Sequence, residues 1–315
     1  MIGFEKIRES LRGASKQGTL AHSHILSGPD GIGKSPMAKT LAGLILRPDS
    51  DVERNYVDII EVRPSGKSIG VDEVRRIIGE ANIMPFEGSR KVIIIYNGEL
   101  MTTQAQNALL KTVEEPQPGV YFIILTKTLD NLLPTIRSRC AIHRLAPISR
   151  TEMIRYITAE HGLSGEPLAE AAAISLGIPG LADAFIRNPE TRLFYDDVIE
   201  FLTNLATVKS LKDRNCLSIL TKNQAILSYG PQRFLEGVLL AVRDLACFKT
   251  YKDYKTIIFL YNREKMKALS QKYTMARLSR IIDVCESASR LLEPGRNING
   301  ETIVNGTLFK LVEET

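Results

Sequence analysis

Short apolar runs alternate with amphipathic stretches along the first half of the chain. The runs are rich in isoleucine, valine and leucine and show little polar alternation, which is typical of strands covered by helices on both faces. They occupy residues 24–27, 58–62, 91–96, 121–125 and 141–145. Amphipathic spacing predicts helices between them over residues 35–46, 72–81 and 103–115, with Asp72 as the N-cap of the second. This alternation predicts an α/β fold, a parallel sheet wound with helices.

The pattern changes near residue 148, after which strand signals almost disappear. Apolar residues then recur at helical spacing over residues 151–161, 167–175, 233–248 and 275–292. We therefore expect three domains. Residues 1–147 would form the α/β domain, residues 148–205 a small helical domain, and residues 206–315 a larger, all-helical domain.

Composition restricts the class of protein more than charge does. The chain has 315 residues, of which 44% are hydrophobic and 24% charged, as in globular proteins of more than one domain. No apolar run is long enough to cross a bilayer, and the N-terminus lacks a signal-peptide core. We therefore expect a cytoplasmic location and no membrane partner. The net charge of +5 permits contact with nucleic acid but does not require it.

The strongest motif follows the first predicted strand. Residues 28–35 read GPDGIGKS and fit the phosphate-loop pattern G-x-x-x-x-G-K-S/T between a strand and a helix. Gly28, Gly31 and Gly33 would let backbone N–H groups surround a phosphate. Lys34 would reach the outer phosphates, and Ser35 would offer its hydroxyl to Mg²⁺. The motif predicts ATP or ADP with Mg²⁺ as the cofactor.

The residues that should hold the metal ion are missing. A phosphate loop needs a carboxylate at the end of a second strand. The strand over residues 91–96 is present, but Tyr96 and Asn97 stand where acids are expected, and Glu99 lies further on. Tyrosine is uncharged at neutral pH, and asparagine cannot act as a base. We assign no metal ligand and expect nucleotide binding to be weak or vestigial, without intrinsic ATPase activity.

Two later segments resemble the clamp-loader subunits of the AAA+ family. Residues 107–116, NALLKTVEEP, resemble the N-A-L-L-K-x-L-E-E-P signature of these proteins. Residues 132–140, LLPTIRSRC, resemble their L-P-T-I-x-S-R-C segment. Residues 60–75 and the triplet Asn297-Ile298-Asn299 are similar to one branch of the family, the delta-prime subunits.

The resemblance implies a P-loop AAA+ domain, a helical lid and a C-terminal all-α collar that joins subunits. It implies a loader that places a sliding clamp on primed DNA, with gamma/tau and delta subunits as partners. In such loaders the S-R-C arginine reaches the ATP site of a neighbouring subunit, and Arg139 matches that position. The family's sensor position after the fourth strand corresponds to Thr126-Lys127-Thr128, where Thr126 or Thr128 can touch phosphate.

The departures from the family pattern favour one role within it. Residues 47–57 contain no cysteine, so the zinc module of the family's ATPase subunits is not predicted. Leu181 stands where working subunits often place an arginine. These losses favour a stator that helps a neighbour to hydrolyse ATP. The alternatives are an ATP-hydrolysing gamma/tau-like subunit and an unrelated P-loop nucleotide kinase, which would leave the two later segments without a role.

Overall fold

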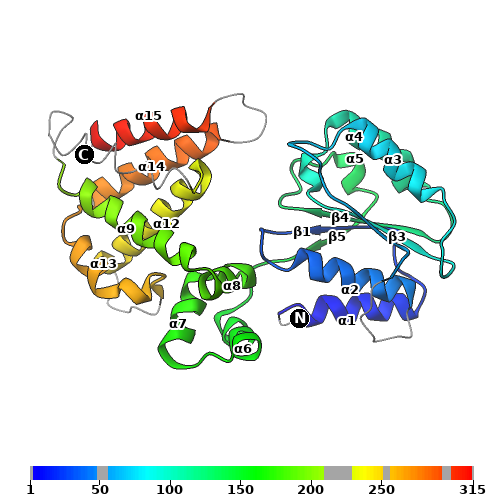
Figure 1. The fold of residues 1–315 in the computed structure, drawn as a ribbon, viewed down its shortest axis with the longest axis horizontal. Coiled ribbons are helices and arrows are strands. Elements are labelled where there is room, and N and C mark those ends of the chain that lie inside the picture. Colours follow the sequence, from blue (N-terminus) through cyan, green and yellow to red (C-terminus); the bar gives the residue numbers. More distant parts are fainter. Residues whose placement is uncertain (1–2, 48–55, 209–228, 251–255, 293–298, 314–315) are drawn as a thin grey trace. The chain divides into compact units, whose positions relative to one another are not determined.

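The structure of the chain is a computed structural model that describes residues 3–47, 56–208, 229–250, 256–292 and 299–313. The chain divides into two compact units (Figure 1). Unit 1 consists of Met1–Tyr156 together with Gly177–Gly180, and unit 2 of Ile157–Leu176 together with Leu181–Thr315. The division into three domains, with boundaries after residues 147 and 205, stays a prediction.

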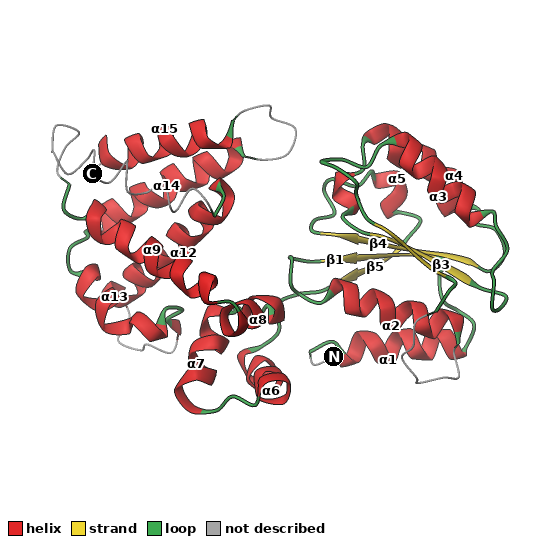
Figure 2. Ribbon diagram, viewed as in Figure 1, coloured by secondary structure: helices red, strands yellow, loops and turns green. Residues whose placement is uncertain are grey.

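Unit 1 contains a five-stranded sheet in the order β2-β3-β4-β1-β5, in which all neighbouring strands are parallel. The strands are β1 (Ser23–Ser27), β2 (Ile59–Val62), β3 (Lys91–Ile95), β4 (Val120–Thr126) and β5 (Ala141–Arg144). One face is covered by α1 (Glu5–Lys16) and α2 (Lys34–Leu46), and the other by α3 (Val71–Ala81), α4 (Thr103–Glu114) and α5 (Pro134–Arg137) (Figure 2). The predicted α/β fold is confirmed.

Burial on both faces explains why the strands read as continuous apolar runs. Every residue of β1, β3 and β4 is buried. On the α3–α4 face, Ile93, Ile95 and Phe122 pack against Val74 and Leu109. Each fully buried side chain of this size contributes roughly 1.5–3 kcal/mol by leaving water. The sheet and its two helical layers therefore hold the strand ends in fixed positions.

The predicted N-cap of α3 was wrong. Asp72 lies in the first turn of the helix, and Gly70 takes the capping position with an extended backbone and no side-chain cap. Asp72 and Glu73 still suit this place, because carboxylates near a helix N-terminus interact favourably with its dipole. Asp72 also pairs with Arg75 across one turn, at 3.2 Å.

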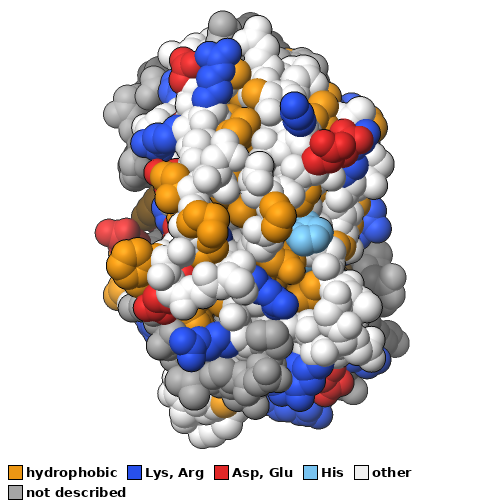
Figure 3. Space-filling view, turned by 90° about the vertical axis from the view of Figure 1, so that its right-hand side faces the viewer, with side chains coloured by type: hydrophobic (Ala, Val, Ile, Leu, Met, Phe, Trp, Pro, Cys, Tyr) orange, Lys and Arg blue, Asp and Glu red, His pale blue; other side chains and the backbone are white. Residues whose placement is uncertain are grey.

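The loop between α3 and β3 exposes apolar side chains at the amino edge of the sheet. Ile83 is 57% exposed, and Met84 and Phe86 are each 84% exposed. The carboxylate of buried Asp58 holds this loop by accepting hydrogen bonds from the N–H groups of Phe86 and Glu87 at 2.6 and 2.8 Å. Figure 3 views the side of the molecule at the right of Figure 1 and shows hydrophobic side chains gathered near the middle of that face.

Unit 2 is built from helices throughout the part that the structure describes. Its helices are the end of α6 (Arg150–His161), α7 (Gly165–Ile174), α8 (Pro179–Arg187), α9 (Pro189–Leu205), α12 (Pro231–Thr250), η3 (Leu260–Asn262), α13 (Arg263–Ser270), α14 (Met275–Leu291) and α15 (Gly300–Glu313). The four helices predicted in the second half of the chain are confirmed. No helix within the described ranges is long and apolar enough to span a membrane.

A single apolar core joins the long helices of unit 2. Phe194 and Leu202 of α9, Phe234 of α12, Leu278 of α14 and Val304 of α15 are all buried in it. The core therefore continues across the boundary predicted after residue 205, because α9 precedes that boundary and its partner helices follow it.

One carboxylate in unit 2 is buried and accepts two backbone hydrogen bonds. Asp244 of α12 is fully buried, and one of its oxygens accepts hydrogen bonds from the N–H groups of Ile258 and Phe259, both at 2.8 Å. The segment before η3 is thereby fastened to α12. The Asn297-Ile298 pair of the predicted family motif lies outside the described residues.

Candidate functional site

The phosphate loop lies at the carboxyl end of β1 and leads directly into α2. Gly31 and Gly33 have φ values of +78° and +109°, a backbone region that side chains other than glycine rarely adopt. A Cβ atom at Gly28 would lie 2.4 Å from the carbonyl oxygen of Leu145. The three glycines predicted for this loop are thus required by its geometry.

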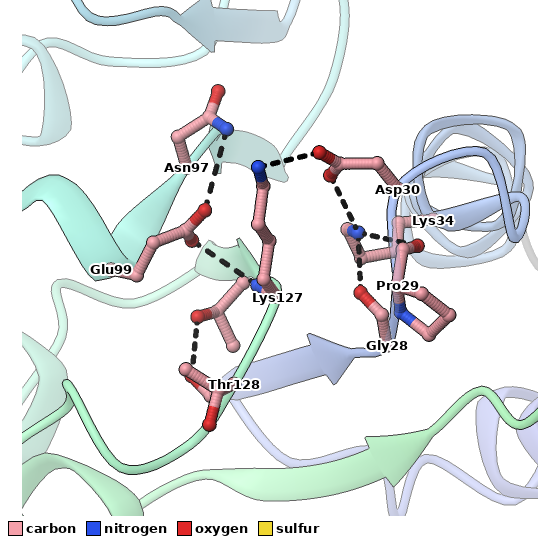
Figure 4. Close-up of polar contacts among 9 residues, drawn as sticks. Gly28, Pro29, Asp30, Lys34, Asn97, Glu99, Lys127 and Thr128 are labelled. Carbon is pink, nitrogen blue, oxygen red and sulfur yellow. Dashed lines mark hydrogen bonds and ion pairs between the residues drawn. The ribbon is translucent and has the colours of Figure 1, made fainter. Parts of the chain in front are cut away.

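The lysine of the phosphate loop is bound to the loop itself (Figure 4). The Nζ atom of Lys34 donates hydrogen bonds to the carbonyl oxygens of Gly28 at 2.5 Å and Pro29 at 2.9 Å, and lies 3.5 Å from the Asp30 carboxylate. Asp30 also pairs with Nζ of Lys127 at 2.6 Å. Burial lowers the pKa of Lys34, and Asp30 opposes that shift. A phosphate entering this loop would have to compete with these contacts for Lys34.

The opposite wall of the site comes from the ends of β3 and β4. Asn97 adopts a left-handed backbone with φ 53°, and its side-chain amide lies 3.5 Å from Glu99. Glu99 in turn accepts a hydrogen bond from the backbone N–H of Lys127 at 3.2 Å. The hydroxyl of Thr126 is buried and donates to the carbonyl of Thr128 at 2.6 Å. Thr126 therefore lies beside the phosphate loop, and its hydroxyl proton is already donated to the carbonyl of Thr128.

A cluster of four side chains lies beside Ser35 of the phosphate loop, near the carboxyl ends of β2 and β3, and we call it the Tyr96 cluster. The hydroxyl of Tyr96 donates to Oε2 of Glu61 at 3.1 Å and also interacts with the hydroxyl of Ser35. Lys39 pairs with Oε1 of Glu61 at 3.1 Å, and Arg63 pairs with Oε2 at 3.0 Å. The Arg63 guanidinium also stacks 3.7 Å from the centre of the Tyr96 ring.

The ionisation of this cluster follows from its contacts. Burial acts to raise the pKa of Glu61, but the hydrogen bonds from Lys39, Arg63 and Tyr96 outweigh it and lower that pKa. Burial, followed by the charge of Glu61, raises the pKa of Tyr96. Glu61 is therefore an anion with both oxygens paired, and Tyr96 is a neutral donor at physiological pH.

These residues do not fit a bound Mg²⁺. Magnesium requires oxygen ligands in near-octahedral geometry and usually takes one or two carboxylates from the protein. Here the carboxylate of Glu61 is engaged on both sides, and the hydroxyl of Ser35 contacts a phenol. In the described ranges there is also no group of three or more histidine, cysteine or acidic side chains that could hold a metal.

The sequence analysis missed three members of the cluster: Lys39, Glu61 and Arg63. A signal for Glu61 was available, because β2 runs beside β3 and pairs Val62 with Ile95, next to Tyr96. An acid near the carboxyl end of the strand beside Tyr96 could thus have been expected at the site. Lys39 and Arg63 carried no comparable signal, since their side chains meet Glu61 only in the folded unit.

Arg139 lies in the short segment between α5 and β5 and is about one-third exposed. Its guanidinium pairs with Glu114 at the end of α4 at 2.9 Å and donates to the carbonyl of Thr135 at 3.1 Å. The two segments that carried the family resemblance are therefore joined in the fold, α4 through Glu114 and the later one through Arg139.

A second link between these segments is buried. Gln106 of α4 is 3% exposed, and its amide nitrogen donates to the carbonyls of Met101 and Asn131 at 3.1 and 2.9 Å. Its amide oxygen accepts the N–H of Leu133 at 2.7 Å. Gln106 thereby fixes the chain just before α5, which leads to Arg139.

The turn at residues 177–180 packs on the tip of the phosphate loop. The N–H of Gly180 donates to the carbonyl of Gly31 at 2.9 Å, and a Cβ at Gly180 would lie 2.7 Å from Cα of Gly31. Only a residue without a side chain allows this close approach. Leu181 follows directly and brings no cation to the position where the family resemblance implied an arginine.

The chain is similar in sequence to subunits of DNA polymerase III. A family model described as DNA polymerase III, delta subunit, matches residues 3–149. DNA polymerase III subunit delta' of Escherichia coli is 37% identical over 120 residues, which are 38% of this chain and 36% of that protein. DNA polymerase III subunit tau of Bacillus subtilis is 26% identical over 319 residues, 90% of this chain and 56% of that protein.

The chain thus spans about half or less of the length of these curated relatives. Among solved structures, a gamma subunit-related protein of DNA polymerase III from Thermotoga maritima resembles it with a TM-score of 0.54 and 18% identity, covering 98% of this chain and 99% of that one. At this identity the likeness concerns the fold alone.

Proposed function

We propose that the chain, which is similar to DNA polymerase III clamp-loader subunits of the AAA+ type, acts as a stator of the loader. A stator assembles with the other subunits and supports their ATP hydrolysis without hydrolysing ATP itself. In this role the chain would work in the cytoplasm with gamma/tau and delta subunits, on a sliding clamp and primed DNA. Residues 206–315 would form the collar that joins it to those partners.

The observation that carries this proposal is the Tyr96 cluster. The glycines and Lys34 of the phosphate loop are present, whereas a paired Glu61 and a neutral tyrosine replace the free carboxylate of a metal site. Without a fixed metal, the charge that develops on transferring a phosphoryl group loses several kcal/mol of stabilisation. The site thus supports weak or vestigial nucleotide binding better than turnover.

Arg139 supports the second half of the proposal. A guanidinium is permanently charged, and its planar fork of donors matches the oxygens of a γ-phosphate. Supplied to a neighbouring chain, such a group raises turnover by about 10³–10⁵-fold. Arg139 is partly exposed on a segment held by Gln106 and Glu114, so its side chain is accessible to a partner.

One observation favours a second candidate, a gamma/tau-like motor subunit. The similarity to the tau subunit of Bacillus subtilis covers 90% of the chain, whereas the similarity to the Escherichia coli delta' subunit covers 38%. A motor subunit would need to hydrolyse ATP with the site described above. ATP turnover therefore separates the two candidates.

The test is reconstitution of the full-length chain with gamma/tau and delta subunits. We expect the three to co-elute in gel filtration, the chain alone to release no phosphate from ATP, and the complex to hydrolyse ATP faster when DNA and clamp are added. Robust turnover by the chain alone would establish the motor candidate instead. A chain that stays monomeric in the mixture would rule out both loader roles.

A further inference from the structure

The Tyr96 cluster brings two cations, Lys39 and Arg63, next to Ser35, at the motif position whose hydroxyl serves Mg²⁺ in other phosphate loops. Ser35 directly follows Lys34, and its hydroxyl contacts Tyr96, so the cluster adjoins the phosphate loop. We propose that this loop binds a nucleoside polyphosphate without Mg²⁺, an inference that rests on the nucleotide site of the proposed function. Lys39 and Arg63 supply the positive charge that the metal ion supplies elsewhere.

The first step of the argument is that Mg²⁺ finds no free ligand set. Both oxygens of Glu61 are paired, one with Lys39 at 3.1 Å and the other with Arg63 at 3.0 Å and Tyr96 at 3.1 Å. A metal ion would have to displace these partners and lose much of its own hydration, which Mg²⁺ does reluctantly. Two unit cations already beside the position also repel a dication.

The second step is that the cations are free to move to a ligand. The side chains of Lys39 and Arg63 are 58% and 60% exposed, so their charged ends are hydrated and a small rotation redirects them. Tyr96 is 4% exposed and donates to Glu61 independently of either cation. Glu61 can therefore keep the hydrogen bond from Tyr96 while Lys39 or Arg63 turns toward a phosphate.

The third step is the charge around the loop. Lys34 and Lys127 both pair with Asp30, at 3.5 and 2.6 Å (Figure 4). With Lys39 and Arg63 they make four cations at the loop and the Tyr96 cluster, alongside the acids Asp30, Glu61 and Glu99. A polyphosphate that takes the place of Asp30 and Glu61 as partner of these cations is neutralised by side chains of the protein, with no requirement for a divalent ion.

The experiment is titration of the full-length chain with ATP by isothermal calorimetry, once in excess EDTA and once with Mg²⁺. We expect dissociation constants that agree within about twofold. Tightening by Mg²⁺ of about tenfold or more would overturn the inference. Absence of binding in both buffers would overturn it as well. The stator proposal is tested separately, by co-elution with partner subunits and by the ATP turnover of the chain alone, so its failure is distinguishable from either of these outcomes.

Variants of Tyr96 test the role of the phenol. Tyr96→Asp places a carboxylate beside Ser35 and should make ATP binding Mg²⁺-dependent, with bound Mn²⁺ becoming detectable by electron paramagnetic resonance. Tyr96→Phe is the matched control, because it keeps the ring under Arg63 and adds no acid; its binding should remain insensitive to Mg²⁺. Mn²⁺ bound by the unmutated chain with ATP as tightly as by Tyr96→Asp would contradict the inference.

Because Tyr96 is buried, a substitution there could prevent folding. A second pair of variants therefore tests the inference at exposed residues. Lys39→Met and Arg63→Met change exposed side chains and should leave the melting temperature nearly unchanged. Each should weaken ATP binding in EDTA by about three- to tenfold. Affinity in EDTA that is unchanged in both variants would show that these cations do not take the place of a metal.

Discussion

The guanidinium of Arg139 and the carboxylate of Glu114 form an ion pair at 2.9 Å between the segment after α5 and the end of α4. Both side chains are partly exposed, at 35% and 50%. Pairs exposed to this degree stabilise a fold by about 0–1 kcal/mol, because water screens them. The ion pair therefore orients Arg139 without being needed for folding, and Arg139 can be changed without unfolding the unit.

Arg139→Ala should lower the ATPase and clamp-loading rates of the reconstituted complex while leaving its assembly intact. The reason is loss of the cation proposed to reach the γ-phosphate in the neighbouring site. Steady-state phosphate release with DNA and clamp measures the effect. Arg139→Lys should not restore the full rate, because an ammonium cannot make the forked contact. Glu114→Gln is the control, since it removes the ion pair and keeps the guanidinium; normal rates for Arg139→Ala would make Arg139 a structural residue.

Asp30→Asn should tighten binding of ATP and of inorganic polyphosphate by about three- to tenfold, which corresponds to roughly 0.7–1.4 kcal/mol. The substitution removes the carboxylate that holds Lys34 and Lys127 and that would repel an entering phosphate. Calorimetric titration measures the change. Asp72→Asn is the matched control, because Asp72 is also an exposed, ion-paired acid but pairs with Arg75 on α3. Equal tightening in both variants would point to net charge rather than to release of the loop.

Gln106→Leu should destabilise unit 1 by about 1–3 kcal/mol, because buried polar groups of the backbone lose their partners. The groups affected are the carbonyls of Met101 and Asn131 and the N–H of Leu133. Chemical denaturation measures the loss. Gln104→Leu on the same helix is the control, since Gln104 is exposed and its replacement should stay within about 0.5 kcal/mol. Similar losses in both variants would remove the special role of Gln106.

The stability of unit 2 should fall as pH rises from about 4 to about 6. Burial raises the pKa of Asp244 from 3.8 to about 6, although the N–H groups of Phe259 and Ile258 act in the opposite direction. Within this range the folded unit holds a proton that the unfolded chain has lost, so raising the pH favours unfolding. Asp244→Asn should abolish this slope and keep both hydrogen bonds, because one oxygen of Asp244 accepts both. Urea unfolding followed across this range measures the slope.

Unit 1 should respond to pH in the opposite sense. Burial, and then the neighbouring His143, lowers the pKa of His24 from 6.5 to about 4. The unfolded chain therefore takes up a proton first as the pH falls, and the stability that depends on neutral His24 is lost between about pH 6.5 and 4. His24→Gln should flatten this dependence in unit 1 and leave that of unit 2 unchanged. The same sign of slope in both units would contradict these assignments.

The sheet and the phosphate loop could be predicted because both are encoded locally. Parallel strands buried on both faces read as uninterrupted apolar runs, and the loop is one contiguous motif. The Tyr96 cluster could be predicted only in part. The sequence shows that Tyr96 is not an acid, but Lys39, Glu61 and Arg63 come from α2, β2 and the loop after β2, and they meet only after the sheet has formed.

The same distinction accounts for a smaller error. Asp72 has a side chain that suits an N-cap, yet the extended backbone at Gly70 takes that place. Contact of Thr126 with phosphate stays a prediction; its hydroxyl proton goes to the carbonyl of Thr128 two residues away. The residue type of Asp72 was compatible with the predicted role, and the neighbouring backbone decided which residue caps the helix.

The strand order has a consequence for how the protein folds. Strand β1 lies between β4 and β5, so Ile25 pairs with Ile124 and with Ile142, both from much later in the chain. Forming these pairs requires closure of long loops, which costs entropy before any contact compensates for it. An N-terminal fragment that ends before β4 lacks both strands that pair with β1, so it cannot hold the phosphate loop in its folded position. During synthesis the loop should therefore acquire its shape only after residue 126 and its successors have left the ribosome, and folding of unit 1 should be slow compared with the local helices of unit 2.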